Sequence, residues 1–436
     1  MKKYDKYKDS GIEWIGEIPE HWKVKRIKEV ANIETGNTPP KSEESNYEGD
    51  FLWVKPDELK ELDIIIETKE KLTKEGRDLS RVVPKGSILV CGIGTIGKMG
   101  VAGKDLSTNQ QINSIIPDNI NLKEQFARFL FLSKLQEEEE RVSNKVVVSI
   151  LNKTKHLQIK IPLPAPAEQI IMFDYLDEAT KKLNKVIENK KRQVELLKEN
   201  SYVVLNKIIK KGLKHHLEMT KLGLDWLKEI PKEWKLKKLK SICYMKGRIG
   251  WQGLSQSEFT TEGPYLITGV NFKDEVIRWG EVYHITEERY NEAPEIQLKI
   301  NDILITKDGT IGKLLFVDQL PGKASLNSHL LVLRPLDNDF LPKYLFYLLQ
   351  SDIFQAHIEL FKTGTTFYGI TQESIGRFKM ILPSIVEQEK IVSYLEEHTI
   401  KNKRSLTLIE EEISQIKEYK KIIINDVVTG KMKVTA

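Results

Sequence analysis

The sequence has few of the features that mark secreted or membrane proteins. It contains only two cysteines, Cys91 and Cys243, which stand far apart and each alone. A disulfide framework and a cysteine-rich metal site are therefore excluded, and a reducing compartment is expected. No run of about 18 apolar residues suggests a membrane span. The charged opening MKKYDKYKDSG is not followed by the apolar stretch of a secretory signal. These absences predict a cytoplasmic protein.

The composition is that of a folded, mildly basic protein. Of the 436 residues, 40% are hydrophobic and 30% are charged, which supplies sizeable cores and excludes a mostly disordered chain. The length corresponds to roughly two to three ordinary domains. The net charge of +5 is compatible with nucleic-acid binding but does not establish it, because many soluble proteins are mildly basic.

The chain contains two copies of one unit. Residues 11–28 (GIEWIGEIPEHWKVKRIK) and 223–240 (GLDWLKEIPKEWKLKKLK) are identical at 9 of 18 positions, with an offset of 212. Residues 163–180 match 382–399 at 8 of 18 positions, and the pentapeptide Gly-Thr-Ile-Gly-Lys occurs once in each copy. The offset drifts only from 212 to 219. This indicates a tandem duplication and not a solenoid, whose periods run roughly 20–50 residues.

Each copy is predicted to hold a β-rich domain followed by a long helix. Short β-branched runs between Gly, Asn and Pro predict strands of a mainly β, mixed domain. Helical stretches at 122–136 and 341–360 have an apolar spacing near 3.6. From Glu168 to about Lys211 the chain has neither Pro nor Gly, which predicts a helix about 66 Å long. The predicted boundaries are 1–165 and 213–384 for the β-rich domains, and 166–212 and 385–436 for the helices.

Apolar residues in the two long segments recur with the heptad spacing of a coiled coil. Because the first helix leads from the first domain to the second, a pairing second helix must run back. The predicted fold is therefore α+β, with two tandem domains joined by an antiparallel coiled coil and related by an approximate two-fold. Lys190, Asn402 and Lys420 fall on the seam and are expected to weaken the coil but fix its register. The alternative is that each helix packs only on its own domain. The apolar seam residues are Leu176, Leu183, Ile187, Val194, Leu197, Val204, Leu395, Leu406, Ile409, Ile413, Ile416 and Ile423.

One segment imitates a phosphate-binding loop. Gly92–Lys98 fits its glycine spacing, but Met99 stands where Ser or Thr would hold magnesium. The second copy has Lys307 in place of Gly92, and the residues that follow look like a strand, whereas a phosphate site needs a helix N-terminus. We therefore predict a structural turn. An enzyme of phosphate chemistry that uses Gly92–Lys98 stays an alternative.

No other segment forms a complete catalytic or metal-binding set. Pro56-Asp57 with Glu67-Thr68-Lys69 imitates a nuclease signature, but the second copy does not keep it. The doublet His215-His216 has no Cys or His partner at ligand spacing. No Gly-x-Ser-x-Gly elbow and no amino-methyltransferase tetrapeptide is found. The sequence thus predicts a binding or scaffolding protein with no catalytic residue and no metal.

Several features together resemble the specificity (S) subunit of Type I restriction–modification enzymes. They are the opening at 13–22 (EWIGEIPEHW), its echo at 225–234, the Gly-Thr-Ile-Gly-Lys turns, and the Pro and Glu-Gln residues at the two helix starts. The resemblance extends over essentially the whole chain. It implies that each β-rich domain is a target recognition domain that reads one half of a split double-stranded DNA site. The helices would set the spacing and dock two methyltransferase (M) subunits.

The resemblance also implies that the chain is not itself an enzyme and holds no cofactor. S-adenosylmethionine, ATP and Mg would belong to the M subunits and to the restriction (R) subunits that join the complex, and no membrane is involved. A coiled-coil scaffold without DNA recognition is the rival hypothesis.

Basic residues gather at equivalent positions of the two copies. Residues 221–248 hold nine Lys or Arg against three acids, and a matching cluster lies at 23–28. Such clusters supply phosphate affinity without sequence information. Base reading is expected from the polar loops 35–38, 246–252 and 362–369, the last with a counterpart near 143–145, because Arg, Asn and Gln can pair with base edges. The candidate DNA-binding residues are Lys23, Lys25, Arg26, Lys28, Asn37, Thr38, Lys98, Asn144, Lys145, Lys237, Lys238, Lys240, Lys246, Arg248, Gln252, Lys313, Lys362, Thr365, Thr366 and Tyr368.

Overall fold

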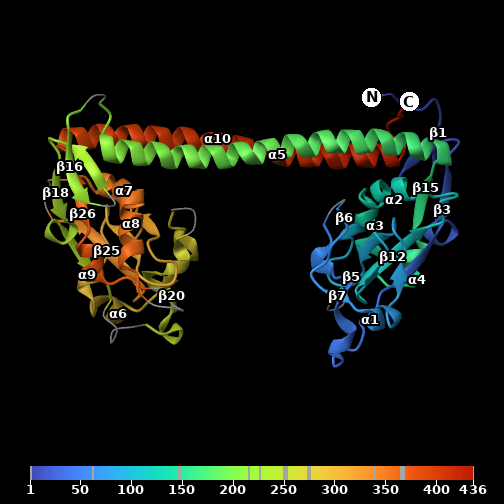
Figure 1. The fold of residues 1–436 in the computed structure, drawn as a ribbon, viewed down its shortest axis with the longest axis horizontal. Coiled ribbons are helices and arrows are strands. Elements are labelled where there is room, and N and C mark those ends of the chain that lie inside the picture. Colours follow the sequence, from blue (N-terminus) through green and yellow to red (C-terminus); the bar gives the residue numbers. More distant parts are fainter. Residues whose placement is uncertain are drawn as a thin grey trace. The chain divides into compact units, whose positions relative to one another are not determined.

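The computed structural model describes residues 2–60, 63–145, 149–214, 217–224, 227–248, 254–272, 276–336, 340–363 and 369–435. It divides into two compact units. Unit 1 comprises Met1–Arg192 with Ile409–Ala436, and unit 2 comprises Gln193–Leu408. Each unit contains a β-rich domain and part of both long helices, α5 (Pro166–Lys211) and α10 (Ile385–Val428) (Figure 1). Among the described residues, no helix combines the length and the apolar character that crossing a membrane requires.

The domain of unit 1 is built on two sheets. The larger has the order β4-β12-β9-β10-β6, and β12 pairs antiparallel with both of its neighbours. The second has the order β7-β5-β11-β8, in which β5 and β11 are parallel. The strands are β4 (Ala31–Thr35), β5 (Tyr47–Val54), β6 (Ile64–Ile65), β7 (Lys71–Leu72), β8 (Val82–Val83), β9 (Ile88–Cys91), β10 (Met99–Ala102), β11 (Leu106–Thr108) and β12 (Ile112–Pro117).

Unit 2 repeats this arrangement. Its sheets have the orders β19-β25-β22-β23 and β21-β20-β24, and β20 and β24 are again parallel. The order matches β4-β12-β9-β10 and β7-β5-β11 strand for strand, so the duplication extends to the topology. These strands are β19 (Cys243–Lys246), β20 (Thr260–Ile267), β21 (Tyr283–His284), β22 (Ile303–Thr306), β23 (Leu314–Phe316), β24 (Ala324–Leu326) and β25 (Leu330–Pro335).

The two helical stretches predicted from apolar spacing are each broken into two helices. The breaks occur at Ser133 and Ser351, whose hydroxyls donate to Leu130 O at 2.7 Å and to Leu348 O at 2.6 Å. The side chain thereby replaces a backbone donor and ends the first helix, which a periodicity count does not detect. The helices are α2 (Glu124–Phe131) and α3 (Leu135–Val142) in unit 1, and α7 (Pro342–Gln350) and α8 (Asp352–Phe361) in unit 2. Shorter helices are α1 (Lys74–Asp78), α4 (Lys153–Gln158), α6 (Glu287–Asn291) and α9 (Gln372–Gly376).

A glutamate in the first turn of each long helix binds a buried tryptophan. Trp22 Nε1 donates to Glu168 Oε2 at 3.0 Å in unit 1, and Trp234 Nε1 donates to Glu387 Oε2 at 3.0 Å in unit 2. A carboxylate at this position also faces the partial positive charge of the helix N-terminus. The repeated Trp-containing opening and the repeated helix start therefore form one structural contact in each unit.

The glutamine that follows fixes the helix start to the rest of its domain. Gln169 Oε1 accepts from Lys123 N at 2.8 Å, and Gln388 Oε1 accepts from Leu341 N at 2.9 Å. Both glutamines are fully buried. Lys123 and Leu341 precede the first residues of α2 and α7. Each glutamine thus satisfies a backbone donor at the beginning of a short helix.

Both long helices end at a glycine. Gly212 has a φ of 70° and Gly430 a φ of 76°, the left-handed conformation that glycine adopts without strain after a helix. An added Cβ would lie 3.1 Å from Trp234 at Gly212 and 3.1 Å from Trp22 at Gly430. The end of α5 therefore packs on the tryptophan of unit 2, and the end of α10 packs on that of unit 1.

The core of each unit uses both long helices. In unit 1 the start of α5 and the end of α10 contribute buried residues to the same apolar cluster, and in unit 2 the roles are exchanged. The two chain termini meet in unit 1, where Lys433 N donates to Lys2 O at 2.9 Å. The helix residues in these cores are Met172, Leu176, Ile423, Ile424, Val427 and Val428 in unit 1, and Ile208, Ile209, Ile391, Val392 and Leu395 in unit 2.

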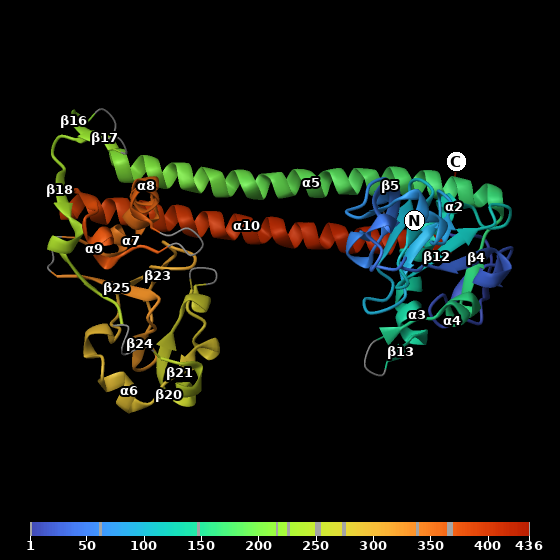
Figure 2. The same ribbon diagram turned by 60° about the horizontal axis from the view of Figure 1, so that its bottom comes forward.

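The long helices lie side by side within each unit (Figures 1 and 2). In unit 1, Lys190 Nζ lies 2.5 Å from Glu412 Oε2, and Lys420 Nζ lies 3.4 Å from Asn184 Oδ1. Since the lower number on one helix faces the higher number on the other, the pair is antiparallel, as predicted. Two of the polar seam residues therefore have polar partners on the opposite helix.

In unit 2 the third polar seam residue behaves in the same way, because Asn402 Nδ2 donates to Ser201 Oγ at 2.5 Å. Pairing on the other helix, and not packing on one domain alone, accounts for these positions. Every predicted apolar seam residue is buried or half-buried: Leu176, Leu183, Ile187, Val194, Leu197, Val204, Leu395, Leu406, Ile409, Ile413, Ile416 and Ile423.

Candidate nucleic-acid interface

Three polar segments of unit 1 meet at one end of its larger sheet. β4 ends at Thr35, next to the end of β9 and the beginning of β12, because neighbouring strands run antiparallel. The hairpin of β13 (Asn144–Lys145) and β14 (Ser149–Ile150) lies against the Gly92–Lys98 turn, where Gly94 N donates to Ser149 O at 3.0 Å. Figure 2 shows this hairpin beside α3 and α4.

Unit 2 brings the equivalent segments together. β19 ends at Lys246, and an added Cβ at the following Gly247 would lie 2.9 Å from Leu330 O at the start of β25. After β22, Asp308 forms a β-bridge with Gly369. The loops chosen from sequence therefore share one sheet edge in both units. We call this edge the loop edge.

In unit 1 the predicted loop residues make internal contacts at the loop edge. Asn37 Nδ2 donates to Leu79 O at 2.8 Å, and its Oδ1 accepts from Arg81 N at 2.9 Å. Thr38 Oγ1 donates to Gln110 Oε1 at 2.5 Å. Lys98 Nζ donates to Pro56 O at 2.7 Å, which ties the Gly92–Lys98 turn to the segment that directly follows β5. These side chains hold the shape of the loop edge.

Arg248 of unit 2 is only 2% exposed. Its guanidinium donates to Leu326 O at 2.9 Å and to Ser325 Oγ at 3.2 Å, and burial lowers its pKa below the usual range. This placement fits a residue that anchors the loop to β24 and does not fit direct contact with DNA. Lys246 and Lys313 are exposed, whereas Lys362 is half-buried and lies 2.5 Å from Glu359.

The basic clusters lie elsewhere on each unit. Lys23, Lys25 and Arg26 belong to β3 (Lys23–Arg26), which pairs with β15 (Lys160–Leu163), the strand that leads into α5. Five residues of β4 separate Lys28 from the loop edge, a distance of about 17 Å at 3.4 Å per residue. The structure therefore does not bring the basic cluster and the loops into one site.

The same separation holds in unit 2. β18 (Lys235–Lys238) carries Lys237 and Lys238, and Lys240 follows it. β18 pairs with β26 (Lys379–Leu382), which leads into α10. The remaining candidates, Gln252, Thr365, Thr366 and Tyr368, lie outside the described residues, as do the side chains of Asn144 and Lys145 and the doublet His215-His216.

Sequence reasoning missed three polar residues at the loop edge. His329 Nδ1 lies 2.7 Å from Asp308 Oδ1, and the His329 side chain is 61% exposed. Arg81, with a side chain 56% exposed, donates to Thr35 O at 2.7 Å and lies beside Glu34. Only Asp308 carried a signal in the sequence, because it directly precedes the repeated Gly-Thr-Ile-Gly-Lys pentapeptide.

The phosphate-loop alternative is wrong for Gly92–Lys98. Gly94 and Gly97 have φ values of 88° and 77°, and strand β10 begins directly at Met99, where a phosphate loop requires a helix. In the nuclease-like segment, Lys69 Nζ forms an exposed ion pair with Asp57 Oδ2 at 2.7 Å, and this pair lowers the pKa of Asp57. Across the described part of the chain, no group of three or more His, Cys, Asp or Glu is arranged to hold a metal ion.

A β-rich domain repeated on a shared pair of long helices defines a duplicated, two-domain class of protein. The family model of the Type I restriction modification DNA specificity domain matches residues 19–196 and 231–418. The chain therefore belongs to this family and carries two copies of its domain.

Curated relatives have the same extent. The chain is 26% identical over 420 residues to the Type I restriction enzyme MjaIX specificity subunit of Methanocaldococcus jannaschii, a match that covers 91% of each chain. It is 26% identical over 440 residues to the MjaVIII specificity subunit of the same organism, covering 96% of this chain and 94% of the relative. The HindI specificity subunit of Haemophilus influenzae is 31% identical over 182 residues, 40% of this chain and 39% of the relative.

Two solved structures share the fold. A chain from work on the structural basis of complex assembly and conformational transition of the type I R-M system aligns with a TM-score of 0.72 at 17% identity, covering 95% of this chain and 99% of that chain. The HsdS subunit from Thermoanaerobacter tengcongensis aligns with a TM-score of 0.52 at 15% identity, covering 95% and 98%. At these identities the likeness concerns the fold alone.

Proposed function

We propose that the chain is the non-catalytic specificity subunit of a Type I restriction–modification complex, in which each unit reads one half of a split DNA site. The observation that carries this proposal is the loop edge. Both units build it from equivalent strands and an equivalent β-bridge, Ile93 with Ile150 in unit 1 and Asp308 with Gly369 in unit 2, yet they display different side chains on it. A repeated scaffold that carries different side chains at its base-contacting positions fits two half-sites of different sequence.

Within this proposal the loop edge and the basic clusters have different roles. The loop edge reads bases, with the exposed Lys246, Lys313 and His329 in unit 2 and Arg81 in unit 1 as candidates. The clusters on β3 and β18 bind phosphates without sequence preference. The domains would then span 1–165 and 213–384, and the spacer helices 166–212 and 385–436.

The two long helices also offer surfaces for partner subunits. Tyr175 and Tyr394, which are equivalent residues of α5 and α10, are 37% and 42% exposed. Val203 and Ile422, another equivalent pair, are 55% and 43% exposed. Large exposed apolar side chains that recur in both copies suit the docking of two methyltransferase subunits. Those subunits would hold S-adenosylmethionine, and restriction subunits would bring ATP and Mg.

Methylome sequencing of a host that expresses the chain with its methyltransferase subunit tests the proposal. We expect a bipartite motif, with two specified halves separated by a fixed number of unspecified bases. A catalytically inactive methyltransferase subunit is the control, because it should leave every site unmethylated. A single continuous motif, or methylation that is the same without the chain, would contradict the proposal.

The helices are proposed to set the distance between the halves. A heptad inserted in α5 between Lys190 and Leu197, with a matching heptad in α10 between Ile409 and Ile416, lengthens both helices by about 10.5 Å. Seven residues keep the seam in phase. The bases within each half should stay the same, and the unspecified gap should grow by about three base pairs at 3.4 Å each. A variant that still methylates with an unchanged gap would show that the helices are not the ruler.

A further inference from the structure

Arg81 of unit 1 is an exposed arginine whose side chain is fixed by its own domain. Its Nη1 donates to Thr35 O at 2.7 Å, and its Nε lies 3.3 Å from Glu34 Oε1. Both partners belong to the end of β4, at the loop edge. The Arg81 side chain is nevertheless 56% exposed. A free surface arginine samples many rotamers, whereas these two contacts present the outer edge of the Arg81 guanidinium to solvent in a defined direction.

The backbone that carries Arg81 is held as well. Asn37 Oδ1 accepts from Arg81 N at 2.9 Å, and Asn37 Nδ2 donates to Leu79 O at 2.8 Å. Between these two residues, Ser80 Oγ lies 2.6 Å from Ser107 Oγ of the buried strand β11. The segment from Leu79 to Arg81 is therefore anchored on the rest of the domain, which keeps the position of the arginine as well as its orientation.

The internal contacts leave one edge of the guanidinium available. Nε faces Glu34 and one Nη1 hydrogen is bound to Thr35, and the Arg81 side chain makes no other hydrogen bond or ion pair with the described residues. The second Nη1 hydrogen and the Nη2 group thus form a pair of donors in one plane. Such a fork matches two acceptors that lie side by side. In the major groove of DNA, O6 and N7 of guanine are such a pair of acceptors.

Glu34 favours a base over a phosphate as the partner of this fork. A phosphate also offers two acceptor oxygens to an arginine. The Glu34 carboxylate beside the guanidinium repels the negative charge of a phosphate, but it does not repel the neutral edge of a base. The second carboxylate oxygen, Oε2, lies 3.9 Å from Lys153 Nζ, so Glu34 is itself held between two cations. A residue in this place orients the arginine and offsets part of its charge.

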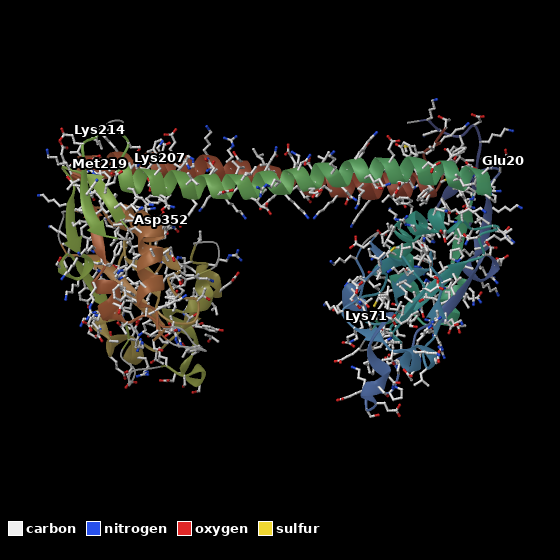
Figure 3. All side chains as sticks on the ribbon, in the orientation of Figure 1. Glu20, Lys71, Lys207, Lys214, Met219 and Asp352 are labelled. Carbon is white, nitrogen blue, oxygen red and sulfur yellow. The ribbon has the colours of Figure 1, made fainter. Side chains whose placement is uncertain are left out.

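Unit 2 carries no arginine at the equivalent place. The helices α1 and α6 correspond, because Thr73 and Thr286 cap them with the same side-chain hydrogen bond. Lys71 of β7, the strand that leads into α1, is labelled in Figure 3. Arg81 stands three residues after the end of α1, whereas the residues that follow α6, 292–298 (EAPEIQL), contain neither Arg nor Lys. A contact of this kind is therefore expected in one half of the DNA site only.

We propose that Arg81 reads a guanine in the half-site of unit 1, with Nη1 and Nη2 donating to O6 and N7, and that Glu34 is the residue that positions it. The inference rests on the proposed function, because it names the base that one residue of the loop edge recognises. The half of the motif that unit 1 reads should then contain a specified guanine–cytosine pair. Loss of a good bidentate contact lowers the preference for that pair by about 5- to 150-fold.

Methylation by the full chain with its methyltransferase subunit tests the proposal. Methylome sequencing gives the wild-type motif, and duplexes with each of the four base pairs at each specified position then give relative methylation rates. Arg81→Gln should lower the preference at one guanine position by about 5- to 150-fold and leave the other half of the motif unchanged. Arg81→Lys should do the same, because lysine keeps the charge and a donor for Thr35 but has no planar fork. Glu34→Gln should lower the preference at that position by a smaller factor without changing the melting temperature, whereas a merely structural role would lower the melting temperature and the rates on all duplexes alike.

Arg26→Gln is the matched control. It makes the same substitution at an exposed arginine of β3, in the cluster proposed to bind phosphates, so it should lower the rates on all duplexes by one factor and keep the motif. If the Arg81 variants behave in that way, Arg81 contacts a phosphate and the inference is overturned. Wild-type preference for guanine in Arg81→Lys would overturn it as well. If the wild-type chain directs no bipartite methylation, the proposed function itself fails.

Discussion

The stem of the loop edge, by which we mean the contact of α3 with α4 in unit 1 and of α8 with α9 in unit 2, is built differently in the two units. In unit 1 it joins α3 to α4 through a fully buried pair, in which His156 Nε2 lies 2.9 Å from Glu139 Oε1, and burial raises the pKa of the Glu139 carboxyl. In unit 2, His357 of α8 takes the position of Glu139, and its Nε2 donates to Ser374 O at 2.7 Å. Burial lowers the pKa of His357, which keeps its ring neutral.

This difference shows what the duplication conserved. The backbone contacts of the loop edge recur in both units, whereas the polar chemistry that supports them changed. A buried pair of ionisable side chains tolerates the loss of neither partner, because the remaining group stays buried without its hydrogen bond. A histidine bound to a backbone carbonyl leaves no ionisable side chain behind when it is replaced. We therefore expect unit 1 to be the more sensitive of the two to polar substitutions at the stem.

The helix starts differ in a similar way. Glu168 accepts from Tyr4 at 2.5 Å and from Trp22 at 3.0 Å, and it also lies 3.1 Å from His21 Nε2. In unit 2 the Glu387 side chain accepts a hydrogen bond from Trp234, and Glu233 stands at the position equivalent to His21. Among the described residues, the carboxylate of Glu387 therefore has fewer donors to lose than that of Glu168.

The largest expected effect comes from Glu139→Ala. It leaves His156 buried without its partner, and breaking a buried pair costs about 3–5 kcal/mol. The free energy of unfolding of unit 1 should fall by that amount, while unit 2 stays unchanged. The double variant Glu139→Leu/His156→Ile is the control, because unit 2 carries Ile375 at the position of His156. It should recover most of the loss, since exchanging a whole buried pair for apolar residues is often neutral or stabilising.

The rate at which one buried cysteine in each unit is alkylated reports how often that unit opens. Burial raises the pKa of the Cys243 thiol to about 12 and also raises that of Cys91. At pH 7.5, which lies below the pKa of an unfolded thiol (about 8.5), both thiols are protonated and inaccessible in the folded units. Alkylation therefore requires opening. Glu139→Ala should accelerate the labelling of Cys91 and not that of Cys243; equal acceleration at both would show that the units do not unfold separately.

A smaller effect is expected at the helix starts. Trp234→Phe removes the indole donor from Glu387 and should cost about 1.5–3 kcal/mol, the range for a hydrogen bond to a charged group. Trp22→Phe should cost less, because Tyr4 and His21 still contact Glu168. Denaturant titrations followed through Cys91 and Cys243 give the two losses separately. A larger loss for Trp22→Phe would reverse the comparison.

The smallest effect is expected on the helix pair. Lys190→Ala removes the contact with Glu412, whose side chain is 53% exposed, and exposed ion pairs contribute about 0.2–1 kcal/mol. The change should be confined to unit 1 and should vanish at 1 M salt, where the screening length is about 3 Å. Thermal melting of wild type and variant at two salt concentrations measures it. A loss that persists in high salt would mean that the lysine stem, and not its charge, matters.

The sequence predicted those features that depend on periodicity and repetition. The duplicated unit, the long helices and their antiparallel seam follow from heptad spacing and from the direction in which α5 must lead the chain. The roles of the repeated Trp and Glu-Gln residues did not follow, because Trp22 and Glu168 are brought together only by the tertiary fold. The breaks at Ser133 and Ser351 were missed because a single hydroxyl ends those helices without disturbing the apolar spacing.

The candidate site was predicted at the level of segments and less well at the level of residues. The loop edge gathers the segments chosen for their Gly and polar content. Arg248 nevertheless turns inward to β24, some 77 residues away in sequence, and Asn37 binds the backbone at Leu79 and Arg81. Whether a polar loop residue faces solvent or its own fold depends on such distant partners, and a single sequence does not contain them.

The measurement that tests the central claim most directly is the methylated motif after exchange of one domain. Residues 1–165 are replaced by the equivalent domain of a related specificity subunit of known motif, while residues 166–436 and the methyltransferase subunit stay the same. The account predicts that one half of the motif changes to that of the donor, and that the other half and the gap between them are retained. A motif in which both halves change together would contradict separate reading by the two units.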